Sequence, residues 1–342
     1  MTMRDILPQT FRARELYGDF WFNSEPIPVT ALRGQVILLM FWDYASAPCL
    51  RTLPYVFEWR RRYDPFGLVT VGVHTPRFPF EKKIEDVQRA VARSGLTFPV
   101  VTDNEALIAA NYECRTTPEL LLIDKDGFVR YRNAGEGGYA SFEHALQALL
   151  YNAGAGGELP MVMDPVRETD RSGVVCYRAT PELLTGYLRG SIGNVEGYAP
   201  ESVVTYADPG LYLDGRFYAG GDWMNDRDCI RMAETGGEEG HLIVCYQGLG
   251  ADAVLVPEGH RKTEVTVRQD NEFIALDARG TDLQIDAAGR SYLVLDEPRL
   301  YSVVRNREYR EHALRFSGGP GRFAAYAFSF TTAVIPELIS KN

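Results

Sequence analysis

The stretch QVILLMFWDYASAPCLRTLPYVFEWRRRY, residues 35–63, decides the fold of the first half of the chain. It opens with a continuous apolar run, residues 35–42, of the kind shown by a parallel strand covered on both faces. A short loop follows, and from Cys49 onward apolar residues recur at helical spacing. The stretch therefore predicts a strand that leads through a loop into a helix, with Pro48 and Cys49 at the helix start.

The residues downstream continue to alternate strand and helix signals. Strands are predicted over 67–75 and 98–103, helices over 80–95 and 141–150, and a hairpin over 119–135 that turns at 125–127. This order predicts an α/β domain in residues 1–151, with a mixed sheet covered by helices on both faces.

The second half of the chain has a different pattern. Residues 152–173 are rich in Gly, Pro and charge, with little periodicity, which predicts a linker. From residue 174, short β-rich runs recur between Gly, Asp and Asn turns at a spacing of about 8–12 residues. Residues 174–342 are therefore predicted to form an all-β sandwich.

Composition excludes several classes of function. The net charge is −10 at pH 7, and binding to a phosphate backbone needs clustered Lys and Arg, so no nucleic-acid partner is expected. No apolar run approaches the ~18–20 residues that a membrane span requires, and residues 1–20 hold no apolar signal core. We expect a cytoplasmic protein without a membrane span.

The cysteines and histidines do not form a recognisable framework. The five cysteines are widely spaced without a C-x-x-C motif, and the five histidines are scattered. The sequence predicts no metal site and no cofactor, since its glycine-rich stretches contain no phosphate-binding loop.

Residues ~20–150 resemble the thioredoxin superfamily, in its TlpA-like or redoxin branch. The family pattern F-W-x-x-x-C-x-P-C begins at Phe41 and ends at Cys49, and only Ser46 departs from it. The segment TTPELLLIDKDG, residues 116–127, resembles the family segment whose cis proline faces the active site, which implies a cis bond between Thr117 and Pro118.

The resemblance extends further, to the thioredoxin-like and carbohydrate-binding-module-like region of DipZ proteins. It is carried by LRTLPY (50–55), GEGGY (135–139), TPELLTGYLRG (180–190) and EPRLYSVVR (297–305). The fold implied is a thioredoxin-like domain followed by a jelly-roll β-sandwich similar to carbohydrate-binding modules.

The resemblance places Ser46 where the attacking cysteine of a dithiol enzyme stands. A thiolate at a helix N-terminus attacks a substrate disulfide, and a second thiol resolves the mixed disulfide. We therefore expect a degenerate S-A-P-C site without classical dithiol exchange, in which Ser46 caps the helix. Cys49, in the resolving position, is expected to be buried, and Met40 stands where thioredoxins often carry a buried Asp.

Three functions remain open at this point. Cys49 could keep single-thiol activity on unidentified protein thiols, or it could attack peroxide as a one-cysteine peroxidase with an antioxidant role. Alternatively, the protein could be a carbohydrate- or protein-binding module carried on an inactive thioredoxin scaffold. The residues expected to form the site with Cys49 and Ser46 are Trp42, Pro48, Thr117, Pro118, His74 and Glu136.

Two further sets of residues are candidates. Cys114 lies four residues before Pro118, so a Cys49–Cys114 disulfide is conceivable. In the second domain, Trp223 lies in the turn-rich GGDWMNDRD and is expected to be exposed, where it could stack on a sugar ring with Asp222 beside it. The nearby Asp and Asn side chains could bind sugar hydroxyls or Ca²⁺, whereas most sandwich aromatics simply fill the core.

Overall fold

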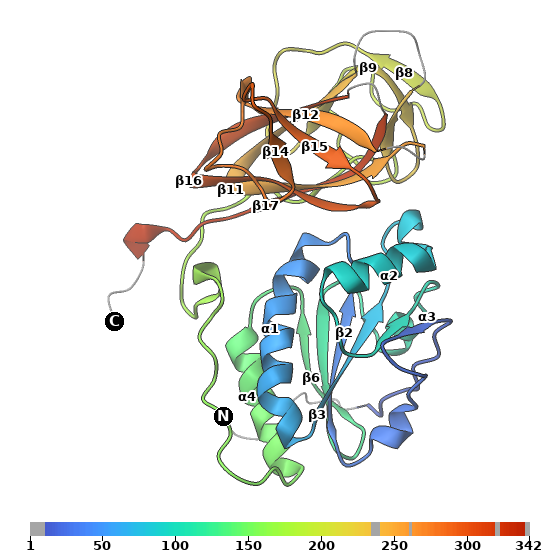
Figure 1. The fold of residues 1–342 in the computed structure, drawn as a ribbon, viewed down its shortest axis with the longest axis vertical. Helices are drawn as coiled ribbons and strands as arrows, with labels where there is room; N and C mark the ends of the chain where they lie inside the picture. Colours follow the sequence, from blue (N-terminus) through green and yellow to red (C-terminus); the bar gives the residue numbers. More distant parts are fainter. Residues whose placement is uncertain (1–10, 234–239, 260–261, 319–321, 339–342) are drawn as a thin grey trace. The chain divides into compact units, whose positions relative to one another are not determined.

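The computed structural model describes residues 11–233, 240–259, 262–318 and 322–338 of the chain. The chain forms two compact units, Met1–Gly173 and Val174–Asn342. Figure 1 shows an α/β first unit and a second unit made of strands. In the described ranges, none of the helices has the length and apolar character needed to cross a membrane.

The first unit is built on a six-stranded mixed sheet with the order β1-β4-β3-β2-β5-β6. Strands β2, β3 and β4 run parallel, and β1, β5 and β6 pair antiparallel to their neighbours. Every residue of β2 and β5 is buried, as expected for central strands covered on both faces. The strands are β1 (Trp21–Phe22), β2 (Val36–Trp42), β3 (Leu68–His74), β4 (Val100–Thr102), β5 (Glu119–Ile123) and β6 (Val129–Ala134).

Helices cover both faces of this sheet, as the sequence predicted. Trp59 of α1 stacks on Phe142 of α4 on one face, while α3 contributes Ile108 to the core on the other. The short helix α3 was not predicted, because five residues carry too little periodicity. The α-helices are α1 (Ala47–Tyr63), α2 (Ile84–Arg93), α3 (Leu107–Asn111) and α4 (Tyr139–Asn152), and the 3-10 helices are η2 (Val29–Leu32), η3 (Asp64–Phe66), η4 (Pro79–Lys82) and η5 (Glu168–Asp170).

Residues 160–170, which we call the strap, lie along α1 and α4 of the first unit. They fall inside the segment expected to be a linker. Four main-chain groups of the strap are bound by side chains of these helices: Pro160 O by Gln147 (2.7 Å), Met161 O by Arg62 (2.6 Å), Met163 N by Glu143 (3.0 Å) and Val166 N by Tyr55 (2.8 Å). This part of the chain is therefore held against the first unit, and the domain boundaries at 151 and 174 stay a prediction.

The second unit is an all-β sandwich organised around two long strands. Strands β11 (His241–Pro257) and β16 (Arg299–Gly318) pair along most of their length, with irregularities between Gly248 and Asp252 where the ladder changes register. The other strands are β7 (Leu183–Leu184), β8 (Val203–Tyr206), β9 (Phe217–Asn225), β10 (Ile230–Met232), β12 (Thr263–Gln269), β13 (Glu272–Phe273), β14 (Leu283–Ile285), β15 (Ser291–Leu295) and β17 (Phe323–Thr331), and η6 (Pro336–Leu338) follows them. Buried residues of β9, β11, β12, β15, β16 and β17 form one apolar core.

Candidate functional site

Helix α1 begins at the candidate site because Ser46 caps it. The Ser46 hydroxyl accepts a hydrogen bond from the backbone N–H of Cys49 (3.4 Å), which confirms the predicted cap. Pro48 lies in the first turn, where its missing N–H leaves no intrahelical bond unmade. The Ser46 hydroxyl is therefore hydrogen-bonded to the backbone at the helix start, beside Cys49.

The Cys49 thiol is completely buried. Its Sγ lies 3.5 Å from the backbone N of Asp43, which donates to it. Burial raises the pKa of Cys49 far above its ordinary value, and the negative charge of Asp43 raises it further. Hydrogen bonds from Ser46, from the Asp43 amide and from the Thr117 side chain act in the opposite direction but are weaker. At neutral pH the group is a neutral thiol.

Asp43, which was not among the residues predicted for the site, is a buried acid directly after β2. Its Oδ1 accepts from the backbone N of Ala45 (2.9 Å), and its Oδ2 accepts from the Thr117 hydroxyl (3.0 Å). The peptide bond between Thr117 and Pro118 is cis, as predicted, and Pro118 is buried. The cis-proline loop therefore contacts the thiol site through Thr117. A sequence signal existed, since an acid directly after a buried strand lies at the edge where sites gather.

His74 and Trp42 end two neighbouring parallel strands in register with each other. Both side chains are fully buried, and the His74 ring packs against Trp42 (centroids 5.5 Å apart) and stacks on Tyr44 (5.4 Å). Neither ring nitrogen of His74 has a hydrogen-bond partner among the described residues. Burial lowers the pKa of His74 to about 3, so the ring is neutral at physiological pH.

Glu81 of η4 is a second buried acid in this region. Its Oε1 accepts from the backbone N of Phe78 (3.1 Å), and its Oε2 lies 3.9 Å from Nε2 of His74. Burial raises the pKa of Glu81 well above its ordinary value, and the nearby carboxylate of Asp43 adds to this, while Arg77 opposes it. Glu81 was not among the residues predicted for the site, because nothing in its local sequence marks it as buried.

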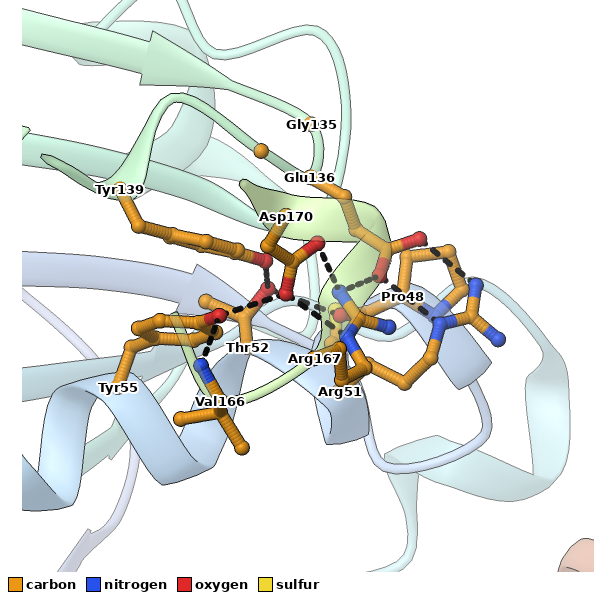
Figure 2. Close-up of polar contacts among 12 residues, drawn as sticks. Pro48, Arg51, Thr52, Tyr55, Gly135, Glu136, Tyr139, Val166, Arg167 and Asp170 are labelled. Carbon is orange, nitrogen blue, oxygen red and sulfur yellow. Dashed lines mark hydrogen bonds and ion pairs between the residues drawn. The ribbon is translucent and has the colours of Figure 1, made fainter. Parts of the chain in front are cut away.

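Glu136 lies near the start of α1 but pairs with arginines rather than with the thiol (Figure 2). Arg51 binds it through two nitrogens (2.8 and 2.7 Å), and Arg167 of the strap binds it at 3.0 Å. Although burial raises the pKa of Glu136, the two guanidinium groups outweigh it and hold the value below the ordinary range. The side chain of Arg51, which lies beside Pro48, is therefore paired with Glu136.

The proposed second thiol, Cys114, forms no disulfide with Cys49, because both residues are free thiols. Cys114 is half-buried, with its Sγ 3.9 Å from the backbone O of Tyr112. Burial raises its pKa, and the neighbouring Glu119 adds to the effect. Cys114 is therefore also a neutral thiol at physiological pH.

The expectation that Trp223 is exposed is wrong. The side chain is completely buried, donates from Nε1 to the backbone O of Gly220 (3.0 Å) and packs edge-on against Phe323. It points into the sandwich core because β9 extends through the glycines that looked like a turn. Asp222 lies on the opposite face of the strand and accepts a hydrogen bond from Thr205. Across the described ranges, no group of three or more His, Cys, Asp or Glu could hold a metal ion.

Known families and relatives match both units. Residues 15–132 match the model of the AhpC/TSA family, and residues 180–331 match that of the thioredoxin-like C-terminal domain. DipZ of Mycobacterium bovis and of Mycobacterium tuberculosis is 34% identical over 318 residues, which cover 91% of this chain and 41% of DipZ. The chain thus spans about two fifths of the length of these relatives.

Smaller relatives match the first unit alone. The thiol-disulfide oxidoreductase YkuV of Bacillus subtilis is 26% identical over 151 residues, 44% of this chain and 97% of YkuV. A thioredoxin-like superfamily protein of known crystal structure is 26% identical, with a TM-score of 0.38, over 44% of this chain and 99% of its own.

Proposed function

We propose that the first unit has lost classical dithiol exchange, because Ser46 stands in place of the attacking cysteine. The unit is a thioredoxin-superfamily domain of the redoxin type, in a chain that is similar to DipZ over most of its length. At most, it keeps single-thiol redox activity on Cys49 toward protein thiols. The proposal gives the protein the scaffold of a thiol-disulfide oxidoreductase without the attacking sulfur.

The state of Cys49 supports this proposal most directly. The thiol has no exposed surface, and a buried acid lies beside it. A thiolate is the reactive form of cysteine, and both burial and a neighbouring negative charge disfavour it. Ser46 cannot replace a thiol, since its hydroxyl is hydrogen-bonded to the helix start and would need a general base to become a nucleophile.

The one-cysteine peroxidase alternative has less support. Such an enzyme needs an accessible thiolate, usually next to a cation. The guanidinium of Arg51 pairs with Glu136 instead, and Cys49 is buried next to Asp43.

A carbohydrate-binding role for the second unit also has less support, because Trp223, its main candidate residue, is buried and cannot stack on a sugar ring. The cytoplasmic location also stays a prediction.

The test is a comparison of the wild-type chain with Ser46→Cys in the dithiothreitol-driven reduction of insulin. We expect the wild type to match the uncatalysed rate, because no thiol stands at the helix N-terminus. Ser46→Cys should restore a C-x-x-C pair at a helix start and accelerate insulin reduction at least tenfold. Ser46→Ala serves as the matched control without a thiol. Insulin reduction by the wild type as fast as that by Ser46→Cys would refute the proposal.

A further inference from the structure

The first turn of α1, which carries Cys49, is weakly joined to the rest of the helix. Pro54 lies inside α1 and has no backbone N–H, so it cannot donate the usual helical hydrogen bond to the carbonyl of Leu50. At the helix start, the bond from the Cys49 N–H to the Ser46 hydroxyl is long, at 3.4 Å. Residues 47–53 therefore depend on side-chain contacts outside the helix for part of their stability.

Two side chains of this turn bind residues near the start of α4. Arg51 pairs with Glu136, which precedes α4, through two nitrogens at 2.8 and 2.7 Å. The Thr52 hydroxyl is hydrogen-bonded to the hydroxyl of Tyr139, the first residue of α4, at 2.9 Å. Movement of the turn that carries Cys49 away from the sheet therefore separates both pairs.

The strap is connected to both of these pairs, as Figure 2 shows. Arg167 of the strap donates to Glu136 Oε1 (3.0 Å), an oxygen that also accepts from the first turn of α1. Asp170 of the strap accepts from the hydroxyl of Tyr55 (2.6 Å), whose ring stacks on that of Tyr139 with centroids 3.7 Å apart. The strap thus reaches the first turn by two routes, one through Glu136 and one through the two tyrosine rings.

The ion pairs of this network share their partners. Arg51 and Arg167 both bind the carboxylate of Glu136, and Arg167 also pairs with Asp170 of the strap at 2.9 Å. The side chains of Arg51, Glu136 and Arg167 are 23–27% exposed, so each single pair contributes little stability. Residues in one network of hydrogen bonds and ion pairs lose stability together rather than independently. We therefore expect the strap and the first turn to open as one unit.

Cys49 has no exposed surface, so a reagent or a protein thiol reaches its sulfur only after a neighbouring segment has moved. Every residue of the preceding strand, β2, is buried at the centre of the sheet, which makes that strand costly to displace. The first turn of α1 lacks the bond that Pro54 cannot donate, and it is held from outside the helix by the network that includes the strap. Access to Cys49 therefore follows the opening of this turn.

We propose that the docked strap keeps Cys49 inaccessible, and that the sulfur is reached when the strap and the first turn of α1 open together. Arg167 of the strap binds Glu136, and Glu136 binds Arg51. Arg51 lies two residues after Cys49, in the turn that covers the sulfur. The strap is therefore an autoinhibitory contact, and its arginine, Glu136 and Arg51 are positioning residues that act on the turn.

This inference rests on the proposed function, since it describes how the proposed single-thiol chemistry of Cys49 is regulated. The two ideas fail separately. Insulin reduction tests the loss of dithiol exchange, whereas alkylation by N-ethylmaleimide measures access to the Cys49 sulfur in a protein that needs no catalytic activity.

Alkylation of the full chain with N-ethylmaleimide at low concentration, followed by peptide mass spectrometry, is the first test. Tyr55→Phe weakens the docked strap, so Cys49 should be alkylated at least about tenfold faster than in the wild type. Cys114, which follows α3, and Cys229, in the second unit, are internal references whose rates should stay the same. An unchanged Cys49 rate would overturn the proposal. Equal acceleration of all three thiols would also overturn it, since access would then come from general unfolding.

Reciprocal coupling is the second test, and it measures the strap rather than the thiol. If the strap stabilises the first turn, the turn must stabilise the strap to the same extent. Arg51→Ala, a change in the turn, should therefore make amides of residues 160–170 exchange about threefold faster or more. The matched control Tyr151→Phe, at the exposed end of α4, should leave both this exchange and the Cys49 alkylation rate unchanged. Wild-type exchange rates for the strap in Arg51→Ala would contradict the coupling.

The wild type alone provides a third test, which holds even if a variant fails to fold. Hydrogen exchange at low urea concentrations gives, for each segment, the free energy of opening and its dependence on urea. Peptides spanning residues 47–53 and 160–170 should share one value of each quantity, as parts of one cooperative unit. Different values for the two segments would refute their joint opening.

Discussion

The hydrogen bonds of the Tyr55 hydroxyl offer the cleanest test of how the strap is held against α1. Tyr55 is buried in α1, donates to Asp170 Oδ2 (2.6 Å) and accepts from the backbone N of Val166 (2.8 Å), as Figure 2 shows. Its ring stacks on Tyr139 at 3.7 Å. Tyr55→Phe keeps this ring contact and removes only the two hydrogen bonds.

The destabilisation caused by Tyr55→Phe depends on the interactions that Asp170 and Val166 keep after the Tyr55 hydroxyl is removed. Asp170 remains paired with Arg167 (2.9 Å), so the lost bond to its carboxylate is worth about 1–1.5 kcal/mol. Val166 is 51% exposed, so water can reach its surroundings, and loss of the bond to its N–H adds about 0.5–1 kcal/mol. Together they destabilise the strap by about 2 kcal/mol, which corresponds to a roughly 30-fold larger open population.

Hydrogen exchange followed by mass spectrometry measures this opening directly. In Tyr55→Phe, amides in peptides spanning residues 160–170 should exchange roughly 30-fold faster, while those of β2 and β5 stay unchanged. The matched control is Tyr151→Phe, since Tyr151 is 58% exposed at the end of α4 and should leave the strap unaffected. Equal exchange rates for residues 160–170 in wild type and Tyr55→Phe would refute the reasoning that side chains of α1 hold this segment.

Three further predictions concern pH and the second unit. Because burial holds the pKa of His74 at about 3, the unfolded chain binds a proton below about pH 6.5 that the folded chain does not, and stability falls with pH by up to ~1.4 kcal/mol per unit. His74→Phe should flatten the urea-unfolding profile between pH 6.5 and 3, and an unchanged slope would contradict the burial of a neutral ring. The pKa of Glu136 is raised by burial but lowered more by its two arginines, so its contribution is present above about pH 4.3 and is lost as pH falls through the lower folded value. Glu136→Gln should reduce stability at pH 7 by about 1 kcal/mol, since the pair is partly exposed, with little difference from wild type at pH 2, and a difference that persists there would argue against an ionic origin. Trp223→Ala should destabilise the second unit by about 3–5 kcal/mol in denaturant titrations, against less than about 1 kcal/mol for Asp222→Asn, and equal effects would contradict the burial of the indole.

The features of the fold that the sequence predicted are those encoded by near neighbours. The start of α1 depends on Ser46 and Pro48, which act within one helical turn of Cys49. The apolar run of β2 and the turn between β5 and β6 are equally local signals. The cis bond before Pro118 came from a family resemblance, since no local rule distinguishes it from an ordinary X-Pro bond.

The features that escaped prediction depend on contacts between distant parts of the chain. Asp43 and Glu81 look like ordinary surface acids, and only the folded sheet buries them, with the Asp43 backbone beside the Cys49 sulfur. Trp223 looked exposed because its glycine-rich neighbours resemble a turn, yet they continue strand β9. The charge of a residue, or the glycine content of its neighbours, is therefore a poor guide to its burial where tertiary packing decides that burial.

The way in which the strap is held bears on how freely its sequence can vary over evolutionary time. The helices bind its main-chain atoms, while Met161 is 87% exposed and Val166 51% exposed. Most residue types could replace these two without changing the path of the chain, so selection should tolerate drift at positions that are nonetheless firmly anchored. The same property makes position 161 suited to a fluorescent or spin label, which would report the attachment of the strap without disturbing it.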